Sequence, residues 1–200
     1  MDYTFVPLSQ LDSTGLTRLA ALHSAVMHTL LSDLGAPIVF HYYEVAQSAA
    51  SVIGLCAIST SGEIDGWAMG SPDPSALNAR LRQPASWFAG QMLRLGFSHP
   101  GALIDLLRAL ISSSDANQLG HGQLELTYIG VAERAQGQGL GKQLLAAFSA
   151  AARQAGYTSI ALSVESDNPA AVALYTRCGF KVTKTFREGR FERQRMEHQL

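Results

Sequence analysis

Residues 124–142 read Leu-Glu-Leu-Thr-Tyr-Ile-Gly-Val-Ala-Glu-Arg-Ala-Gln-Gly-Gln-Gly-Leu-Gly-Lys, and this stretch decides the fold. Its first half is a short apolar run, which is typical of a strand. After the glycines, apolar residues recur at helical spacing: Leu140, Leu144, Leu145, Phe148, Ala151 and Ala152. Glycine carries no Cβ, so a ligand can approach the backbone where several N–H groups converge at a helix start. The stretch therefore predicts a strand, a loop and a helix that form an anion site, best suited to phosphate.

The composition bounds the class of protein. The chain has 200 residues, of which 47% are hydrophobic and 16% charged, enough for one domain with a sizeable core. A net charge of -1 gives no electrostatic case for nucleic acid or an anionic membrane surface as a partner. The N-terminus lacks the pattern of a signal peptide, and no apolar run is long enough for a membrane span. We therefore expect a cytoplasmic protein whose partners are small molecules or proteins.

The two cysteines indicate neither a disulfide framework nor a metal site. Cys56 and Cys178 do not form a Cys-x-x-Cys pair, so we expect no metal. A covalent cysteine mechanism is disfavoured because Cys178 stands beside Gly179 at a predicted helix end without a paired histidine, and Cys56 lies in an apolar strand.

The residues before the central stretch predict a strand, two helices, a hairpin and an insertion. Asp12, Ser13 and Thr14 are candidate caps of the first helix, whose apolar stripe ends near Gly35. The second helix leaves a strand open as an alternative. The ranges are a strand at Tyr3–Leu8, a helix at Ile38–Ala46, hairpin strands at Ser51–Ile58 and Ile64–Met69, and a helical insertion at Pro72–Gly122 with helical patterns at Ala76–Leu81, Trp87–Leu95 and Leu103–Ile111.

The residues after the central helix predict a strand, a helix and a closing hairpin. Ser159–Val164 has strand character, and Asn168-Pro169 begins a helix that ends near Cys178, before Gly179. Phe180–Phe186 and Phe191–Gln199 then alternate apolar and polar residues. The order of elements predicts an α/β protein, a mixed sheet with helices on both faces.

Spacing excludes two common glycine motifs. A P-loop needs glycine where Gln136 stands, and Ser or Thr where Gln143 follows Lys142. A dinucleotide fingerprint needs glycine at 142 or 144, where Lys142 and Leu144 stand.

Two other segments resemble one family. Gln136-x-x-Gly139-x-Gly141, between strand and helix, resembles the acyl-CoA pyrophosphate loop, Gln/Arg-x-x-Gly-x-Gly/Ala, of the GNAT superfamily of N-acyltransferases. Residues 168–180 read Asn-Pro-Ala-Ala-Val-Ala-Leu-Tyr-Thr-Arg-Cys-Gly-Phe, similar to that superfamily's Asn-x-x-Ala-x-x-Leu-Tyr-x-x-x-Gly-Phe. The resemblance is firm over about 124–200 and topological before that. It implies a GNAT-type α/β (α+β) fold over 1–200: a mixed, mainly antiparallel sheet with helices on both faces and the insertion at about 72–122 before the central strand.

The resemblance also implies a donor site for acetyl-CoA. Ile129 and Val131 would hydrogen-bond the pantetheine arm through their main chain and polarise the thioester carbonyl. Asn168 would lie near the pantetheine, although helix capping alone also explains it. The backbone of the loop would hold the pyrophosphate, through Gln136, Gly137, Gln138, Gly139, Gly141 and Lys142.

The same resemblance suggests two catalytic residues. Tyr175 would protonate the departing CoA thiolate, and packing on the sheet is its alternative role. Glu125 occupies the position of a base glutamate in histone-type members, and its apolar neighbours favour a raised pKa. A charge on the solvated face of a strand is the alternative for Glu125. His121 with a chain of waters is the next candidate base, ahead of Glu133 and Glu165.

These features together predict an acyltransferase that transfers groups other than aminoacyl groups. We expect it to move the acetyl group of acetyl-CoA to a primary amine on a small molecule or peptide, by direct attack in a ternary complex. A non-catalytic acyl-CoA-binding module and a transferase for a longer acyl chain are the alternatives. The sequence identifies no particular acceptor, and a homodimer is left open. The position of the insertion suggests that it forms a lid or one wall of the acceptor pocket.

Overall fold

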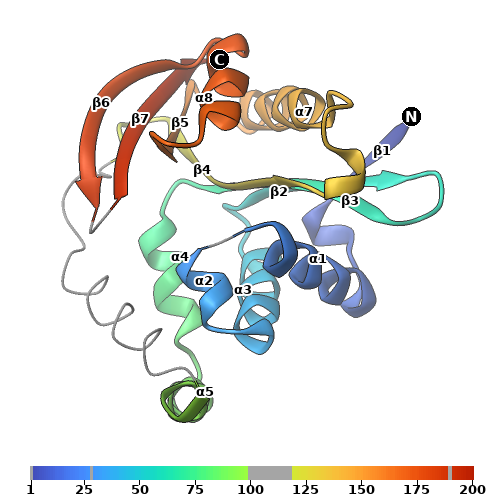
Figure 1. Cartoon of the computed structure of the whole chain (residues 1–200), viewed down its shortest axis with the longest axis vertical. Coiled ribbons are helices and arrows are strands. Elements are labelled where there is room, and N and C mark those ends of the chain that lie inside the picture. The colour runs from blue at the N-terminus through green and yellow to red at the C-terminus, as the bar shows by residue number, and fades with distance from the viewer. Residues whose placement is uncertain (1, 28, 99–118, 189–190) are drawn as a thin grey trace.

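Seven strands form one mixed sheet in the computed structural model, which describes residues 2–27, 29–98, 119–188 and 191–200 (Figure 1). The strand order is β1-β2-β3-β4-β5-β7-β6. Only the β4–β5 pair is parallel, and the other neighbours are antiparallel. The strands are β1 (Tyr3–Pro7), β2 (Ile53–Ser59), β3 (Ile64–Ser71), β4 (Gln123–Val131), β5 (Ser159–Glu165), β6 (Lys181–Glu188) and β7 (Phe191–Gln199). The predicted mixed, mainly antiparallel sheet is confirmed.

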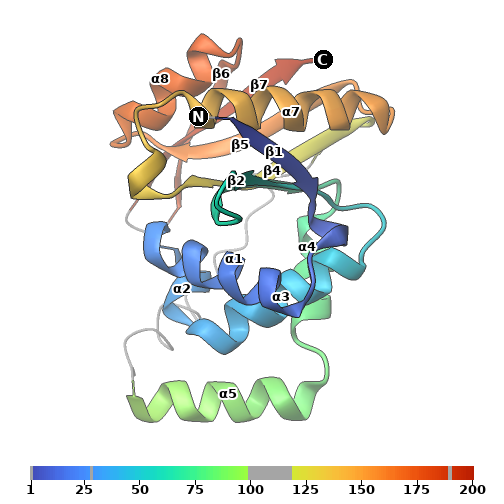
Figure 2. The same cartoon turned by 90° about the vertical axis from the view of Figure 1, so that its right-hand side faces the viewer.

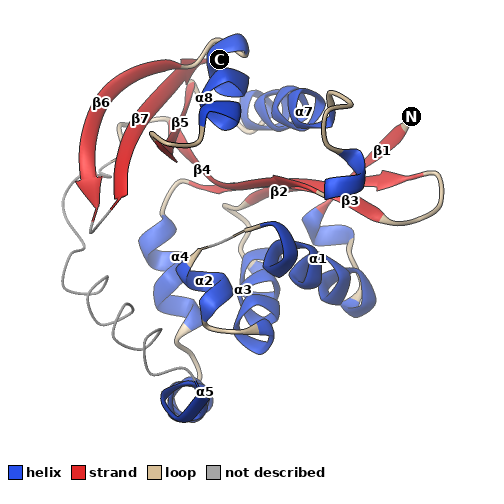
Figure 3. Cartoon of the chain, in the orientation of Figure 1, coloured by secondary structure: helices blue, strands red, loops and turns tan. Residues whose placement is uncertain are grey.

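Helices cover both faces of this sheet, as predicted (Figures 2 and 3). On one face lie α1 (Ser13–Val26), α2 (Leu30–Asp33), α3 (Ala36–Ser48) and α4 (Pro74–Leu81), and on the other lie α7 (Leu140–Gln154) and α8 (Pro169–Arg177). Helix α5 (Ala85–Ser98) lies farther from the sheet, beyond α3 and α4. Short 3-10 turns occur at Leu8–Gln10 (η1) and Glu133–Ala135 (η3). None of the helices in the described part of the chain is long and apolar enough to cross a bilayer.

Local signals start and stop these helices. Asp12 caps α1 by accepting the Gly15 N–H at 2.7 Å, and Asn168 caps α8 by accepting the Ala171 N–H at 3.0 Å. Gly179 follows α8 with φ +89°, the left-handed conformation that ends many helices.

The first predicted helix is in fact two helices. Helix α1 ends at Val26 because Met27 is extended, and the Ser32 hydroxyl donates to the Met27 carbonyl at 2.6 Å across the break. The apolar stripe continues over the break because both helices pack into the same core. Periodicity alone therefore missed the interruption.

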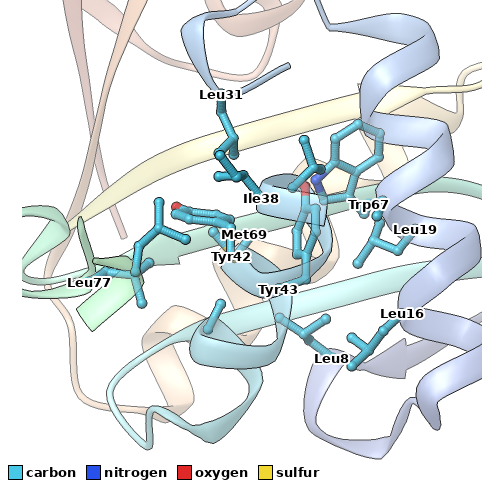
Figure 4. Packing of buried hydrophobic residues seen from close by; sticks show 14 of the residues in the cluster. Leu8, Leu16, Leu19, Leu31, Ile38, Tyr42, Tyr43, Trp67, Met69 and Leu77 are labelled. Atoms are coloured by element: carbon cyan, nitrogen blue, oxygen red, sulfur yellow. The ribbon is translucent and has the colours of Figure 1, made fainter. Parts of the chain in front are cut away.

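The core beneath α1 and α3 is rich in aromatic rings (Figure 4). Trp67 on β3 and Tyr43 on α3 are at most 1% exposed and lie beside Leu19 and Ile38. Truncating a buried tryptophan such as Trp67 to alanine costs about 3–5 kcal/mol. His23 is also fully buried here, and its Nδ1 lies 2.7 Å from the Tyr43 hydroxyl. The second core lies on the other face, beneath α7 and α8.

The segment between β3 and β4 contains helices, as expected for the insertion. Helices α4 and α5 match the first two helical patterns, and the third pattern, at 103–111, lies outside the described residues. Residues 189–190 of the closing turn also lie outside them.

Candidate active site

Strands β4 and β5 pair only at their beginnings. Gln123–Glu125 align with Ser159–Ala161, and from Leu126 to Val131 no strand among the described residues pairs with β4 on that side. On its other edge, β5 pairs with β7 over its whole length, from Ser159 to Glu165. We call this divergence the fork. Ile129 and Val131 lie on the open stretch of β4. Backbone groups at this edge, apart from the Val131 carbonyl that accepts from Gln136, are therefore available to an extended ligand.

The glycine loop presents a row of backbone donors next to the end of β4. Within the described part of the chain, the N–H groups of residues 137–142 have no hydrogen-bond partner; the first bonded amide is that of Gln143, 3.2 Å from the Gly139 carbonyl. Gly137 and Gly139 have φ +73° and +80°, which residues with a Cβ rarely adopt. The donors converge at the N-terminus of α7, a geometry that binds phosphate groups. Lys142 is exposed in the first turn of this helix.

Side-chain hydrogen bonds and an ion pair hold the loop in place. The Gln136 amide donates to the Val131 carbonyl at 3.1 Å, and the Gln138 amide donates to the Arg134 carbonyl at 2.9 Å. Arg134 forms an ion pair with the buried Asp65 of β3 at 2.5 Å. Tyr3 on β1 hydrogen-bonds the same carboxylate. No motif in the sequence predicted the pairing of Asp65 with Arg134, because it depends on how β3 lies against the start of the loop.

The two segments that carry the resemblance lie against each other. A Cβ added to Gly141 would lie 3.2 Å from the Leu174 side chain of α8, so the glycine permits close approach of α7 and α8. Asn168 is exposed at the start of α8. The start of α7 and helix α8 are therefore in contact on the same face of the sheet.

Tyr175 lies in the core on the α7–α8 face. Its side chain is 8% exposed, and its ring centroid is 5.8 Å from that of Phe180. Burial raises the pKa of the Tyr175 hydroxyl to about 12, so it carries its proton at neutral pH. This hydroxyl makes no hydrogen bond to another described residue, which leaves its proton available to a ligand.

Glu125 is paired with Arg195 of β7 at the point where the fork opens. Arg195 Nη1 donates to Glu125 Oε1 at 2.7 Å, and Nη2 lies 2.5 Å from Oε2. Burial raises the pKa of the Glu125 carboxyl, and the guanidinium of Arg195 opposes that rise. Glu125 is therefore not on a solvated strand face, since it is only 7% exposed. Arg195 was missed by the sequence analysis because a lone arginine in the last strand carries no local signal.

Tyr175 and Glu125 lie on opposite faces of the sheet. Leu124 and Leu126 belong to the core beneath α7, so Glu125 between them points to the other face. Tyr175 belongs to the α7 core. The two candidate catalytic residues therefore flank the sheet from its two sides.

The other candidate bases are farther from this arrangement. His121 is exposed before β4, and Glu133 is exposed in η3. Glu165 Oε1 lies 3.7 Å from Arg193 Nη2 at the end of β5.

A forked mixed sheet with a row of loop amides beside its central strand is the architecture of a class of acetyltransferases. The acetyltransferase (GNAT) family model matches residues 38–180, and the chain belongs to this family. A mycothiol acetyltransferase from Saccharomonospora viridis is 33% identical over 107 residues, which cover 53% of this chain and 35% of that protein. The chain thus spans about a third of the length of the curated relatives it matches.

Solved structures share the fold over the whole chain. The ribosomal-protein-S18-alanine N-acetyltransferase of Escherichia coli has a TM-score of 0.63 at 15% identity, with 99% of this chain and 94% of that chain covered. The yncA protein of Salmonella typhimurium, solved with acetyl-CoA, has a TM-score of 0.62 at 17% identity, with 100% and 95% covered. At these identities the likeness is one of fold.

Proposed function

We propose that the protein is an N-acetyltransferase that moves the acetyl group of acetyl-CoA to a primary amine by direct attack in a ternary complex. The observation that carries the proposal is the row of unpaired N–H groups at residues 137–142, next to the open edge of β4. The loop would bind the pyrophosphate of the donor. The main chain of Ile129 and Val131 would bind the pantetheine arm and polarise the thioester carbonyl, and Asn168 would lie beside that arm.

The two catalytic residues divide the proton transfers between the two faces of the sheet. Glu125 takes a proton from the attacking ammonium group, directly or through water, and the free amine then attacks the thioester carbon. Arg195 uses one acceptor position on each oxygen of Glu125, and a carboxylate oxygen has two. When the C–S bond breaks, Tyr175 gives its proton to the thiolate of CoA, and the nitrogen, which still carries one excess proton, returns a proton to Tyr175 directly or through water. Glu125 then releases to solvent the proton that it took from the ammonium group.

The acceptor is proposed only as a class, a primary amine on a small molecule or peptide. The relatives named mycothiol acetyltransferase cover half of this chain, and the matched residues are a third of their own length. Their acceptor therefore belongs in the first screen, together with polyamines, amino sugars and peptides with a free N-terminus.

The decisive experiment measures free thiol released from acetyl-CoA with each amine, against a reaction without amine. Amine-dependent release together with an acetylated product supports the proposal. Binding of CoA without release from any donor would indicate a non-catalytic binding module instead. The same assay with succinyl-CoA and a fatty acyl-CoA tests the acyl group, and faster turnover with the long chain would replace acetyl in the proposal.

A further inference from the structure

Three strands contribute side chains to one polar cluster at the fork, on the face opposite α7 and α8. Glu125 comes from β4, Ser163 from β5 and Arg195 from β7. Arg195 Nη1 donates both to Glu125 Oε1 at 2.7 Å and to the Ser163 hydroxyl at 3.1 Å, and Nη2 lies 2.5 Å from Oε2. Arg195 and Glu125 are 5% and 7% exposed. The guanidinium thus bridges β4 to β5 beside Glu125, the last residue of β4 that pairs with β5.

Burying these two charges costs free energy, so their close pairing indicates that the position of Glu125 is fixed. A buried carboxylate and a buried guanidinium each lose hydration, and only a close, well-aligned pair compensates for that loss. A planar guanidinium with two donors on one carboxylate fixes both the position and the rotation of that carboxylate, which a lysine ammonium cannot do. The contact to Ser163 fixes the guanidinium in turn, because Ser163 and Arg195 are opposite each other in the β5–β7 ladder.

We infer that Arg195 is a positioning residue for the reaction, which holds the carboxylate of Glu125 in a fixed orientation at the mouth of the fork. The inference rests on the proposed function, in which Glu125 is the base. Arg195 does not touch the reacting atoms and acts through Glu125. Its second effect is to favour the ionised carboxylate, the form that can accept a proton.

The charged groups that act on Glu125 within the described residues are both on β7. Arg195 favours the carboxylate, and Glu197 disfavours it. Burial also disfavours the charge and is the largest cause of the raised pKa of Glu125. Loss of Arg195 therefore raises that pKa further, so the acidic limb of the rate profile moves to higher pH.

The test compares Arg195→Lys, Arg195→Met, Glu125→Gln and the double variant Glu125→Gln with Arg195→Lys. Arg195→Lys keeps a positive charge in the site and serves if Arg195→Met fails to fold. We expect Arg195→Lys to lower kcat roughly tenfold with the donor KM changed less than about twofold, and Glu125→Gln to lower kcat about a hundredfold. In the Glu125→Gln background, Arg195→Lys should change kcat by less than about twofold, because the two residues act as a unit. Glu44→Gln, which changes the exposed contact with His41 on α3, is the control for replacement of a carboxylate elsewhere.

An equal loss of kcat from Arg195→Lys in both backgrounds would overturn the inference, and so would wild-type kcat and pH profile in folded Arg195→Lys. A second readout does not depend on turnover. Carbon-13 NMR of the Glu125 carboxyl should show a titration midpoint at higher pH in Arg195→Met, which loses the positive charge, than in the wild type. If the wild type transfers no acetyl group to any amine, the proposed function fails, while an unchanged midpoint contradicts the role of Arg195 on its own.

Discussion

The proposed donor side of the fork, which is the loop at 137–142 with α8, and the proposed acceptor side, which is the Glu125–Arg195 pair, are built in different ways. On the donor side, the loop and α8 come from two contiguous segments, and the proposed binding groups are backbone amides at residues 137–142. On the face of α1–α4, the candidate base and its partner come from residues 125 and 195, 70 positions apart. A backbone site needs only the right local conformation, whereas a side-chain site needs strands placed by the whole sheet. The comparison teaches that a backbone site for the donor can be inferred from a local motif, whereas a side-chain site for the acceptor cannot.

The largest expected effect is a loss of kcat when the proposed proton donor to the leaving thiolate is removed. Tyr175→Phe removes the proton for the leaving thiolate and should lower kcat about a hundredfold, with little change in donor KM. Steady-state kinetics measures this, with Tyr157→Phe as the matched control for loss of a tyrosine hydroxyl from the same core. Because the pKa of Tyr175 is raised to about 12, its ionisation should leave kcat unchanged up to roughly pH 10. An unchanged kcat in Tyr175→Phe would remove this residue from the mechanism.

A smaller effect tests whether the loop conformation makes the donor site. Gly139→Ala places a Cβ on a residue at φ +80° with no atom within 4 Å, so backbone strain is its only direct consequence. We expect CoA to bind about tenfold more weakly by calorimetry, because the amides turn away from the phosphate. Gly62→Ala imposes the same strain at φ +80° in the β2–β3 turn and should leave CoA binding unchanged. Equal affinities in both variants would contradict the role of the loop.

The support behind the loop should have a lesser effect. Asp65→Asn removes the charge that holds Arg134, and we expect CoA affinity to fall about threefold. Asp12→Ala removes the cap of α1, which should lower the free energy of unfolding by about 1 kcal/mol without altering CoA affinity. Titration calorimetry and urea denaturation of both variants separate the two outcomes. If Asp65→Asn loses stability but keeps full affinity, the ion pair supports the fold and not the site.

The last prediction concerns stability, with the smallest expected effect on activity. It involves the aromatic core beneath α1 and α3. Burial lowers the pKa of His23 to about 4, below about 6.5 in the unfolded chain. The unfolded state therefore binds more protons between these values, so stability is full above pH 6.5 and falls as the pH drops towards 4. We expect the free energy of unfolding to fall by about 2 kcal/mol from pH 7 to pH 5, and His23→Gln to flatten that slope. An unaltered slope in His23→Gln would assign the pH dependence to other groups.

Much of the fold could be predicted from sequence because its signals are local. Asp12, Asn168 and Gly179 mark helix ends through contacts within three or four residues, and the helix ends lie where they indicate. Alternation and turn residues likewise predicted the β2–β3 hairpin. The break at Met27 could not be predicted, because the Ser32 hydroxyl that caps it leaves the apolar pattern intact.

The sequence by itself determined the conformation of the loop that we propose binds the donor. Glycines at 137 and 139 permit positive φ angles, and the helix after them aligns the amides, so spacing and residue type were sufficient. Only the tertiary structure decided the surroundings of Glu125: β7 inserts between β5 and β6 and brings Arg195 to the fork. The physical reason is that a buried charge is tolerated only with its partner in place, and the partner is chosen by strand order and register, which no short stretch of sequence contains.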